Sequence, residues 1–405
     1  MKIKNIIGRQ IFDSRGHPTI EADVILENGI IGRAAVPSGA STGINEAVEL
    51  RDNDKKRHHG NGVLTAIDNV NTLIRKKLVG ANPMEQEKID KTLIALDGTP
   101  NKSKLGANAI LSVSLATAKA AALYKNIQFF EYINTLMHKN TRITLPIPMI
   151  NIINGGKHAH GSTDIQEFMI VPSGAKNFTE CLRMSSEIFH HLHLVLREKG
   201  YGTTVGDEGG YAPRVKNGNK EALDLIIEAI KKSGYILGKD VSLALDIAAS
   251  ELYEKGRYHL KTENKTLTSS EMVEWICSLV KKYPIISIED GLDQEDWDGW
   301  IKLNKILGKK IQIVGDDLLV TNTKFLKKGI EQKAANAILI KLNQIGTLTE
   351  TLQAIEMANA GGWTSIIPHR SADNGAPTID HLAVATDTGQ KQPSSSARPS
   401  RRAQT

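Results

Sequence analysis

The sequence predicts an α/β protein in which a smaller α+β domain precedes a (β/α) barrel. A chain of 405 residues is too long for one ordinary core and long enough for a barrel of ~250 residues plus a second domain. Strand-like alternation followed by helical patterns fills the first part, whereas short apolar runs alternate with helical segments from Leu145 onward. We therefore place the α+β domain at residues 1–139 and the barrel at residues 140–390.

The N-terminal domain begins with a predicted antiparallel hairpin. The segments TIEADVILENG and IIGRAAVPSG alternate apolar and polar residues, and Asn28 with Gly29 supplies the turn. The later segment NAILSVSLATAKAAALYKN is rich in alanine and has no proline or glycine inside it. It is therefore predicted to be a helix.

The barrel portion contains short apolar runs rich in Ile, Val and Leu, which fit strands buried on both faces of a parallel sheet. These runs are PIPMINIIN, DIQEFMIV, SLALD, IISIED, IQIVGDD, AILIKLN and TSIIPHR. The charged or ionisable residues Glu289, Asp316, Lys341 and His369 near the ends of the last four are spaced 25 to 28 residues apart. One strand, one helix and two loops occupy about that length, so a barrel is the natural closure.

Composition indicates a globular protein of the cytoplasm. Hydrophobic residues make up 40% and charged residues 24%, and no apolar run approaches the ~18–20 residues of a membrane span. The N-terminus lacks the apolar segment of a secretory signal, and Cys181 and Cys277 cannot form a disulfide framework. We expect a soluble, cytoplasmic protein with two ordinary core thiols.

The net charge of +6 does not indicate a nucleic-acid partner, because most of it lies in the tail. Residues 391–405 contain Lys391, Arg398, Arg401 and Arg402 and no acid, which leaves +2 for the rest of the chain. This Ser, Pro and Arg-rich tail has little to bury, so we expect the chain after Gly389 to be disordered.

The strongest chemical signal is that five strand-like runs each end in an ionisable residue. These residues are Asp246, Glu289, Asp316, Lys341 and His369. Singly, each could be a helix cap or an ordinary loop residue. Barrel enzymes, however, place catalytic groups at the carboxyl ends of their strands, where the groups converge on one mouth.

The three carboxylates and Lys341 together indicate metal-assisted carbon-acid chemistry. Carboxylates gathered at one mouth cannot all stay ionised without a cation, and all-oxygen ligation is what Mg²⁺ prefers. An apolar surrounding favours the neutral amine that Lys341 would need as a general base, and its structural alternative is a salt bridge to one of these carboxylates. Mg²⁺ with a lysine base suits removal of a proton next to a carboxylate.

Three glycine-rich stretches accompany these residues: VPSGASTG at 36–43, INGGKHAHGSTDIQEF at 153–168 and VGDEGGYAP at 205–213. Each could be an ordinary flexible loop. The third sets Glu208 between glycines, where bare backbone allows a carboxyl group to approach a substrate closely. Such a group can act as the general acid for a leaving hydroxyl.

Long motifs in this chain resemble those of the enolase (phosphopyruvate hydratase) family, in the family's order. They are DSRGHPT, VPSGASTG, NKSKLGANAILSVSLA, INGGKHA, DIQEFMIVP, VGDEGGYAP, SIEDGLDQEDWDGW, VGDDLLVTNT and ILIKLNQIGTLTET, between about Ile6 and His369. The resemblance implies an α+β cap domain on an atypical (β/α)8 TIM barrel. It also implies a Mg²⁺-dependent homodimeric glycolytic lyase acting on a small phosphorylated carboxylate.

Carried over residue by residue, the resemblance assigns roles to the residues of the predicted mouth. Ligands of the structural Mg²⁺ would be Asp246, Glu289 and Asp316, and Ser41 would bind a second ion. Lys341 would take the C2 proton of 2-phosphoglycerate, and Glu208 would protonate the departing C3 hydroxyl. Neighbouring site residues would be His158, Glu167, Gln166 and His369, with Arg370 and Ser371 on the phosphate. His58 and His59 have no such counterpart, and we expect them to face solvent.

The chain departs from the family pattern near its C-terminal end. The family continues its His-Arg-Ser motif with Gly-Glu-Thr-Glu-Asp, where this chain reads HRSADNGAP at 369–377. The family's Gly-Gln-Ile-Lys-Thr-Gly, whose lysine clamps the substrate carboxylate, is replaced by GQKQPSS, with Gln392 at the position of that lysine. Beyond it, the Ser, Pro and Arg-rich tail takes the place of the family's closing helices, which begin near an Arg-Ser-Glu-Arg motif. The barrel is therefore expected to be truncated, with exposed apolar surface.

Three functions are compatible with this pattern. The first is a working phosphopyruvate hydratase. The second is a paralogue with an altered substrate, such as a carboxyphosphonoenolpyruvate synthase of phosphonate biosynthesis, because the changes fall on the substrate clamp. The third is a catalytically weak protein that serves as a binding module.

Overall fold

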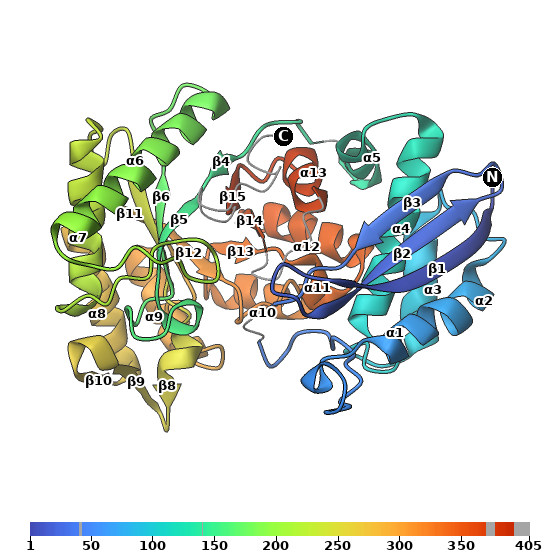
Figure 1. The fold of residues 1–405 in the computed structure, drawn as a ribbon, viewed down its shortest axis with the longest axis horizontal. Helices are drawn as coiled ribbons and strands as arrows, with labels where there is room; N and C mark the ends of the chain where they lie inside the picture. Colours follow the sequence, from blue (N-terminus) through green and yellow to red (C-terminus); the bar gives the residue numbers. More distant parts are fainter. Residues whose placement is uncertain (40–42, 140, 370–376, 393–405) are drawn as a thin grey trace.

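A computed structural model describes residues 1–39, 43–139, 141–369 and 377–392. The described chain forms two parts that lie side by side, a three-stranded sheet with helices and a larger barrel (Figure 1). Three predicted site residues, Ser41, Arg370 and Ser371, lie outside the described residues, as does the tail from 393 onward.

The predicted N-terminal hairpin is confirmed. Strand β2 (Pro18–Leu26) pairs antiparallel with β3 (Ile31–Ala35), and Gly29 in the turn has a positive φ of 86° that favours glycine. Strand β1 (Ile3–Phe12) was not predicted, yet it pairs with β2 along its whole length. Its alternation is broken by a register shift between Ile3 and Asn5 and by apolar residues at exposed positions, Ile7 and Phe12.

The predicted alanine-rich helix is α4 (Ala107–Lys125), which packs on β2 and β3. It is long and apolar enough to cross a membrane, but 83% of its most apolar window is buried inside the structure, so it is packed as a core helix. Its close approach requires Gly32, since a Cβ there would lie 2.1 Å from the Ala116 carbonyl oxygen. The other helices of this part are α1 (Leu64–Asn69), α2 (Arg75–Leu78), α3 (Gln86–Asp97) and α5 (Phe129–Leu136), with a π-helical turn (Val70–Ile74) joining α1 to α2.

The larger sheet has the strand order β4-β15-β14-β13-β12-β11-β7-β6-β5. Only Met149 separates β4 from β5, so one stretch of chain pairs with β15 at one end and β6 at the other, which closes the sheet into a barrel. The strands are β4 (Ile147–Pro148), β5 (Ile150–Asn154), β6 (Glu167–Val171), β7 (Ser242–Asp246), β11 (Ile285–Glu289), β12 (Gln312–Gly315), β13 (Ala337–Leu339), β14 (Thr364–Pro368) and β15 (Gln390–Gln392).

Two of the strand pairs make this barrel atypical. Strand β6 runs antiparallel to both β5 and β7, whereas the pairs from β7 round to β4 are parallel. Every predicted strand run of the barrel is found, and the predicted α+β plus TIM-barrel architecture is confirmed. The reversal of β6 brings its first residue, Glu167, to the same mouth as the last residues of its neighbours.

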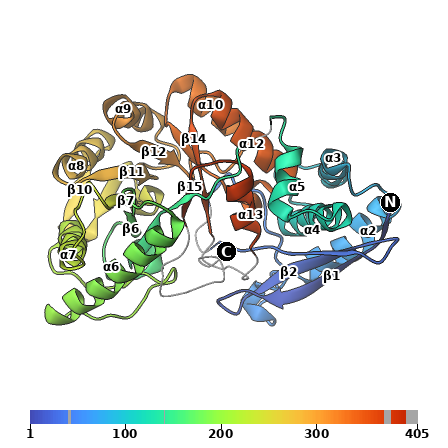
Figure 2. The same ribbon diagram turned by 90° about the horizontal axis from the view of Figure 1, so that it is seen from above.

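Helices cover the outside of the barrel, as the view from above shows (Figure 2). They are α6 (Phe178–Glu198), α7 (Gly218–Lys232), α8 (Ser269–Lys282), α9 (Trp297–Leu307), α10 (Thr323–Gln332), α12 (Leu348–Ala360) and α13 (Thr378–Ala385). The short helix α11 (Leu342–Ile345) instead directly follows Lys341 at the mouth and contacts α4 of the N-terminal part. A small separate sheet of β8 (Tyr253–Glu254), β9 (Arg257–Leu260) and β10 (Lys265–Leu267) follows β7.

The expectation of disorder after Gly389 is wrong for residues 390–392, which form β15. This strand pairs with β14 and β4, and the backbone N–H of His369 donates to the Gln392 carbonyl at 2.9 Å. The sequence GQKQ has no apolar pattern, and backbone hydrogen bonds define the strand. The rest of the tail, residues 393–405, lies outside the described residues.

Candidate active site

Strand periodicity explains how the predicted site residues reach one mouth. Alternate residues of a strand point to the same face, and a small cluster of buried apolar residues, which includes Ala244, Val314 and Leu339, is separate from the main core. Two positions further along, each of these three is followed by a charged residue. These charged residues are Asp246, Asp316 and Lys341. Apolar side chains therefore fill this part of the barrel interior, and ionisable side chains gather at the carboxyl ends of its strands.

Three predicted metal ligands lie at the ends of consecutive strands. Glu289 stands beside Asp246 in the register of β11 with β7, and Asp316 directly follows β12, the next strand. All three are buried. Burial and the charges of Asp246 and Asp316 raise the pKa of Glu289 well above its usual range, and burial together with Glu167 raises the pKa of Asp246 to about 7.

These carboxylates fit a divalent cation. The Glu289 Oε2 atom is buried with no hydrogen-bond partner among the described residues, which is a costly state for a carboxylate oxygen. A hard cation would satisfy that atom and remove the mutual repulsion, and a donor set made only of carboxylate oxygens matches Mg²⁺.

Two acidic residues of the site were missed from the sequence, Asp290 and Asp317. Carboxylate oxygens of Asp290, Asp316 and Asp317 lie within 4.8 Å of one another. Asp290 Oδ1 accepts from the backbone N–H of Asp316 at 2.9 Å, and Oδ2 accepts from that of Asp317 at 3.0 Å. Since both Asp290 oxygens already hold the 316–317 backbone, we interpret Asp290 as the residue that orients Asp316. The doublets Glu289-Asp290 and Asp316-Asp317 were the available signal.

Lys341 lies beside the carboxylates. Its ammonium forms an ion pair with Asp316. The sequence leaves such a salt bridge open as the structural alternative to a general-base role for Lys341. Gln344 Nε2 donates to the other Asp316 oxygen, Oδ1, at 2.7 Å, and the Lys341 backbone N–H donates to Thr321 Oγ1 at 2.8 Å. The Asp316 carboxylate is thus held by Lys341 on one oxygen and by Gln344 on the other.

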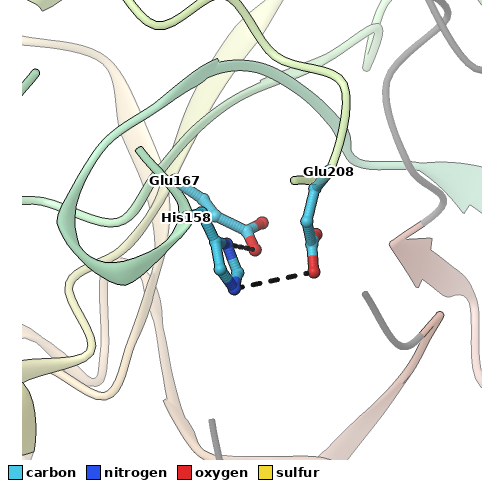
Figure 3. A group of neighbouring side chains, drawn as sticks. All are labelled: His158, Glu167 and Glu208. Atoms are coloured by element: carbon cyan, nitrogen blue, oxygen red, sulfur yellow. Dashed lines mark ion pairs between the residues drawn. The ribbon is translucent and has the colours of Figure 1, made fainter. Parts of the chain in front are cut away.

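The second half of the mouth is a group of His158, Glu167 and Glu208 (Figure 3). His158 comes from a short 3₁₀ turn (Gly156–His158) after β5 and Glu208 from the predicted glycine-rich loop. His158 Nδ1 lies 3.3 Å from Glu167 Oε1, and its Nε2 lies 3.8 Å from Glu208 Oε1. His369 Nε2 is 2.9 Å from the other Glu208 oxygen, Oε2, so the structure brings the four predicted acid–base residues together.

The residues of this group shift the pKa values of one another in different directions. Burial raises the pKa of Glu208, but the charges of His369 and His158 outweigh burial and hold that pKa well below its usual range. Burial, and next the charge of Glu208, raise the pKa of Glu167 to about 7. Burial lowers the pKa of His158, but the carboxylates of Glu208 and Glu167 outweigh it and raise this pKa to about 9. Oxygens of Glu167 and Glu208 lie within 4.8 Å of each other, so the charge of Glu208 makes Glu167 the more easily protonated of the two.

Two glutamines complete the mouth. Gln166 Nε2 donates to Asp246 Oδ2 at 2.8 Å, which links the acid–base group to the carboxylates. Gln392, the residue at the position of the family's clamp lysine, donates from Nε2 to Glu167 Oε2 at 2.8 Å.

Other predicted residues fall at the margin of this site. Among the described residues, Gly43 ends the loop that contains Ser41, and a Cβ at Gly43 would lie 3.1 Å from Asp317 Oδ1. Gly43, the last residue of the glycine-rich stretch 36–43, therefore lies beside Asp317. His59 is exposed as expected, whereas the expectation for His58 is wrong: it is half-buried, with its ring edge-on to Phe12 at 5.9 Å.

The fold and this site together define a lyase of the enolase superfamily. Two family models match the chain: the enolase N-terminal domain over residues 3–133 and the enolase C-terminal TIM barrel domain over residues 142–405. The chain belongs to the enolase family.

Proposed function

We propose that this protein catalyses the Mg²⁺-dependent, reversible dehydration of 2-phosphoglycerate to phosphoenolpyruvate. The observation that supports it most is the placement of the base and the acid. Lys341 follows β13 and Glu167 begins β6, and three strands, β12, β11 and β7, separate these two in the barrel order. A substrate in the mouth would therefore meet a lysine on one side and the carboxylate and imidazole group on the other.

The ion would be held by Asp246, Glu289 and Asp316, and Ser41 would bind a second one. When bound, Mg²⁺ supplies Lewis-acid stabilisation of the negative charge that develops on the substrate carboxylate.

The residues of the chain move the protons. Lys341 would act as the neutral amine, with Asp316 bound to Mg²⁺ and no longer paired with the lysine. It takes the proton from C2, and the electron pair of that C–H bond becomes the C2–C3 double bond. The C3–O bond breaks, and the hydroxyl leaves as water with a proton from Glu208. Because the low pKa of Glu208 leaves it ionised in the free protein, Glu167, whose pKa is raised to about 7, would first supply that proton to Glu208. His158 and His369 hold Glu208 in place, and Arg370 and Ser371 would bind the phosphate.

This function is tested by following phosphoenolpyruvate formation from 2-phosphoglycerate with Mg²⁺ and after addition of a chelator. We expect turnover that stops with the chelator. Lys341→Ala is expected to slow exchange of the C2 proton with solvent by ~10²–10⁴-fold, the range attributed to general base catalysis. Unchanged exchange in Lys341→Ala, or indifference to the chelator, would contradict the proposal.

One observation favours a second function, that of a paralogue with another substrate. The neutral Gln392 occupies the position of a substrate-binding lysine, while the carboxylates and Lys341 are retained. A carboxyphosphonoenolpyruvate synthase activity would appear as product formation only when a phosphonate acceptor is added. Absence of activity with both substrates would favour a binding role.

A further inference from the structure

The Gln392 side chain is buried at the end of β15, and only its amide nitrogen has a hydrogen-bond partner among the described residues. Its Nε2 donates to Glu167 Oε2 at 2.8 Å, and its backbone carbonyl accepts from the His369 N–H at 2.9 Å. The side-chain Oε1 atom is buried and has no hydrogen-bond partner among the described residues. Gln392 is only 4% exposed, so bulk water does not readily reach that atom.

The chemistry of Glu167 fixes which way the amide points. When Glu167 is ionised its carboxylate can only accept, so the amide nitrogen faces Glu167 and the amide oxygen is left for another group. On its other oxygen Glu167 faces His158, at 3.3 Å. Glu167 is thus held between an imidazole and a neutral amide.

The remaining oxygen selects what can occupy this corner of the mouth. An anionic group here would meet the Gln392 Oε1 dipole and the Glu167 oxygen beside it, which repel it, while the His158 cation is already paired with Glu167 and Glu208. A hydroxyl group would donate to Oε1 and satisfy an acceptor that is otherwise buried without a partner.

We infer that Gln392 positions the Glu167 carboxylate and that its Oε1 accepts a hydrogen bond from the substrate hydroxyl that leaves as water. This inference rests on the proposed function and assigns a specificity role to a strand that closes the barrel. It predicts that the corner beside β15 selects a hydroxyl group and not a carboxylate.

The test compares two ligands that differ only in that hydroxyl. In a Lys341→Ala background, where substrate is not turned over, calorimetry measures the binding of 2-phosphoglycerate and of 2-phospholactate, which lacks the C3 hydroxyl, in the presence of Mg²⁺. Adding Gln392→Met is expected to weaken 2-phosphoglycerate about tenfold, as loss of one buried hydrogen bond does, and to leave 2-phospholactate within about twofold. Equal effects on the two ligands would overturn the acceptor role.

The positioning role of Gln392 is tested by the rates of dehydration and of C2 proton exchange in variants that keep Lys341. Gln392→Met is expected to lower dehydration at least about tenfold while exchange of the C2 proton falls less than about threefold, because Gln392 bonds Glu167 and Lys341 lies across the barrel from Glu167. Gln392→Asn keeps the amide but is one methylene shorter, so it is expected to act in the same direction. Gln390→Met, two residues earlier in the same strand, is the matched control and is expected to change both rates less than about twofold. Equal loss of exchange and dehydration in the Gln392 variants would overturn the positioning role.

Melting temperatures identify the variants that fold, and if Gln392→Met does not fold, Gln392→Asn gives both readouts. Failure of the proposed function is distinguishable from failure of this inference. A wild-type protein that forms no phosphoenolpyruvate contradicts the function, whereas an active wild type with unchanged Gln392 variants contradicts only the role of Gln392.

Discussion

Asp23 shows at the scale of one residue how an ion-pair cluster stabilises the N-terminal sheet. It lies on β2 between Arg9 of β1 and Arg33 of β3, pairs with both, and is buried itself. Burial raises the pKa of Asp23, but hydrogen bonds and charges of Arg33 and Arg9 outweigh it and lower this pKa to about 2. The carboxylate is therefore stabilised in its ionised form.

The lowered pKa of Asp23 predicts a stability loss in acid. Because the folded-state pKa is below the unfolded value, the contribution is complete above about pH 4 and is lost as the pH falls toward about 2. Asp23→Asn is expected to lower the free energy of unfolding at pH 7 by about 1 kcal/mol, discounted for the exposed arginines, and to flatten its acid dependence. Urea unfolding between pH 2 and 7 measures this, with the exposed Asp68→Asn as control; an unchanged acid limb would contradict it.

Asp290 offers a second prediction at this scale. Its two oxygens accept from two backbone N–H groups, and an asparagine side chain has only one oxygen to do so. Asp290→Asn is therefore expected to loosen the Asp316 backbone and weaken Mg²⁺ binding ~10–100-fold, the effect reported for groups that orient metal ligands. Calorimetric titration with Mg²⁺ measures it.

The control for Asp290 is Asp293→Asn, in the same loop. Asp293 Oδ1 accepts from the Glu295 N–H at 2.9 Å, so this change removes a loop carboxylate that holds no predicted ligand. Equal Mg²⁺ affinity in both variants would contradict an orienting role for Asp290.

At the scale of elements, the contact of α4 with β3 depends on the absence of a side chain at Gly32. A Cβ there would meet Ala116 O at 2.1 Å and Ala120 N at 2.3 Å, and backbone atoms cannot move aside as a flexible side chain can. Gly32→Ala is expected to lower the free energy of unfolding by ~3 kcal/mol through overpacking. Gly202→Ala, where nothing lies within 4 Å, is the control and should be nearly neutral in thermal melts.

The elements also show how far sequence reasoning reached. Strands such as β7 and β12 were predictable because burial on both faces leaves apolar runs that end in an acid. Strands β1 and β15 were missed because their side chains show no clear apolar alternation: those of β1 are mixed and those of β15 are polar. The proximity of Asp246, Glu289 and Asp316 could be predicted because each lies at the end of a strand. The role of Asp290 could not be predicted, because it depends on the local backbone conformation of that residue, which residue spacing in the sequence does not reveal.

At the scale of the whole molecule, buried polar contacts join the two parts. Asp90 of α3 accepts from the Thr349 N–H of α12 at 2.9 Å and from its Oγ1 at 2.6 Å, and Lys102 pairs with Glu350 at 3.0 Å. Gln344 of α11 also donates to Glu46, at 3.3 Å. Because these groups are largely withdrawn from water, separating the parts would leave them without partners.

The junction predicts coupled unfolding of the two parts. Thr349→Val removes one of the bonds to Asp90 and is expected to lower the free energy of unfolding by about 1–2 kcal/mol while the melt stays a single transition. Thr92→Val, whose hydroxyl bonds only the carbonyl of Lys88 on an exposed helix face, is the control. Calorimetry with two separate transitions in wild type would contradict coupling.

The seam between β4 and β15 has a consequence for biosynthesis. The strand that seals the ring is the last of the barrel strands to leave the ribosome, whereas its partner β4 is the first. A nascent chain thus carries an open, unsealed sheet edge through almost the whole synthesis of this domain, with a row of unpaired backbone groups exposed to other chains. Completion of the ring, and with it the placement of Gln392 beside Glu167, consequently waits until the last described barrel strand has been synthesised, and chaperone protection of the open edge would matter most until then.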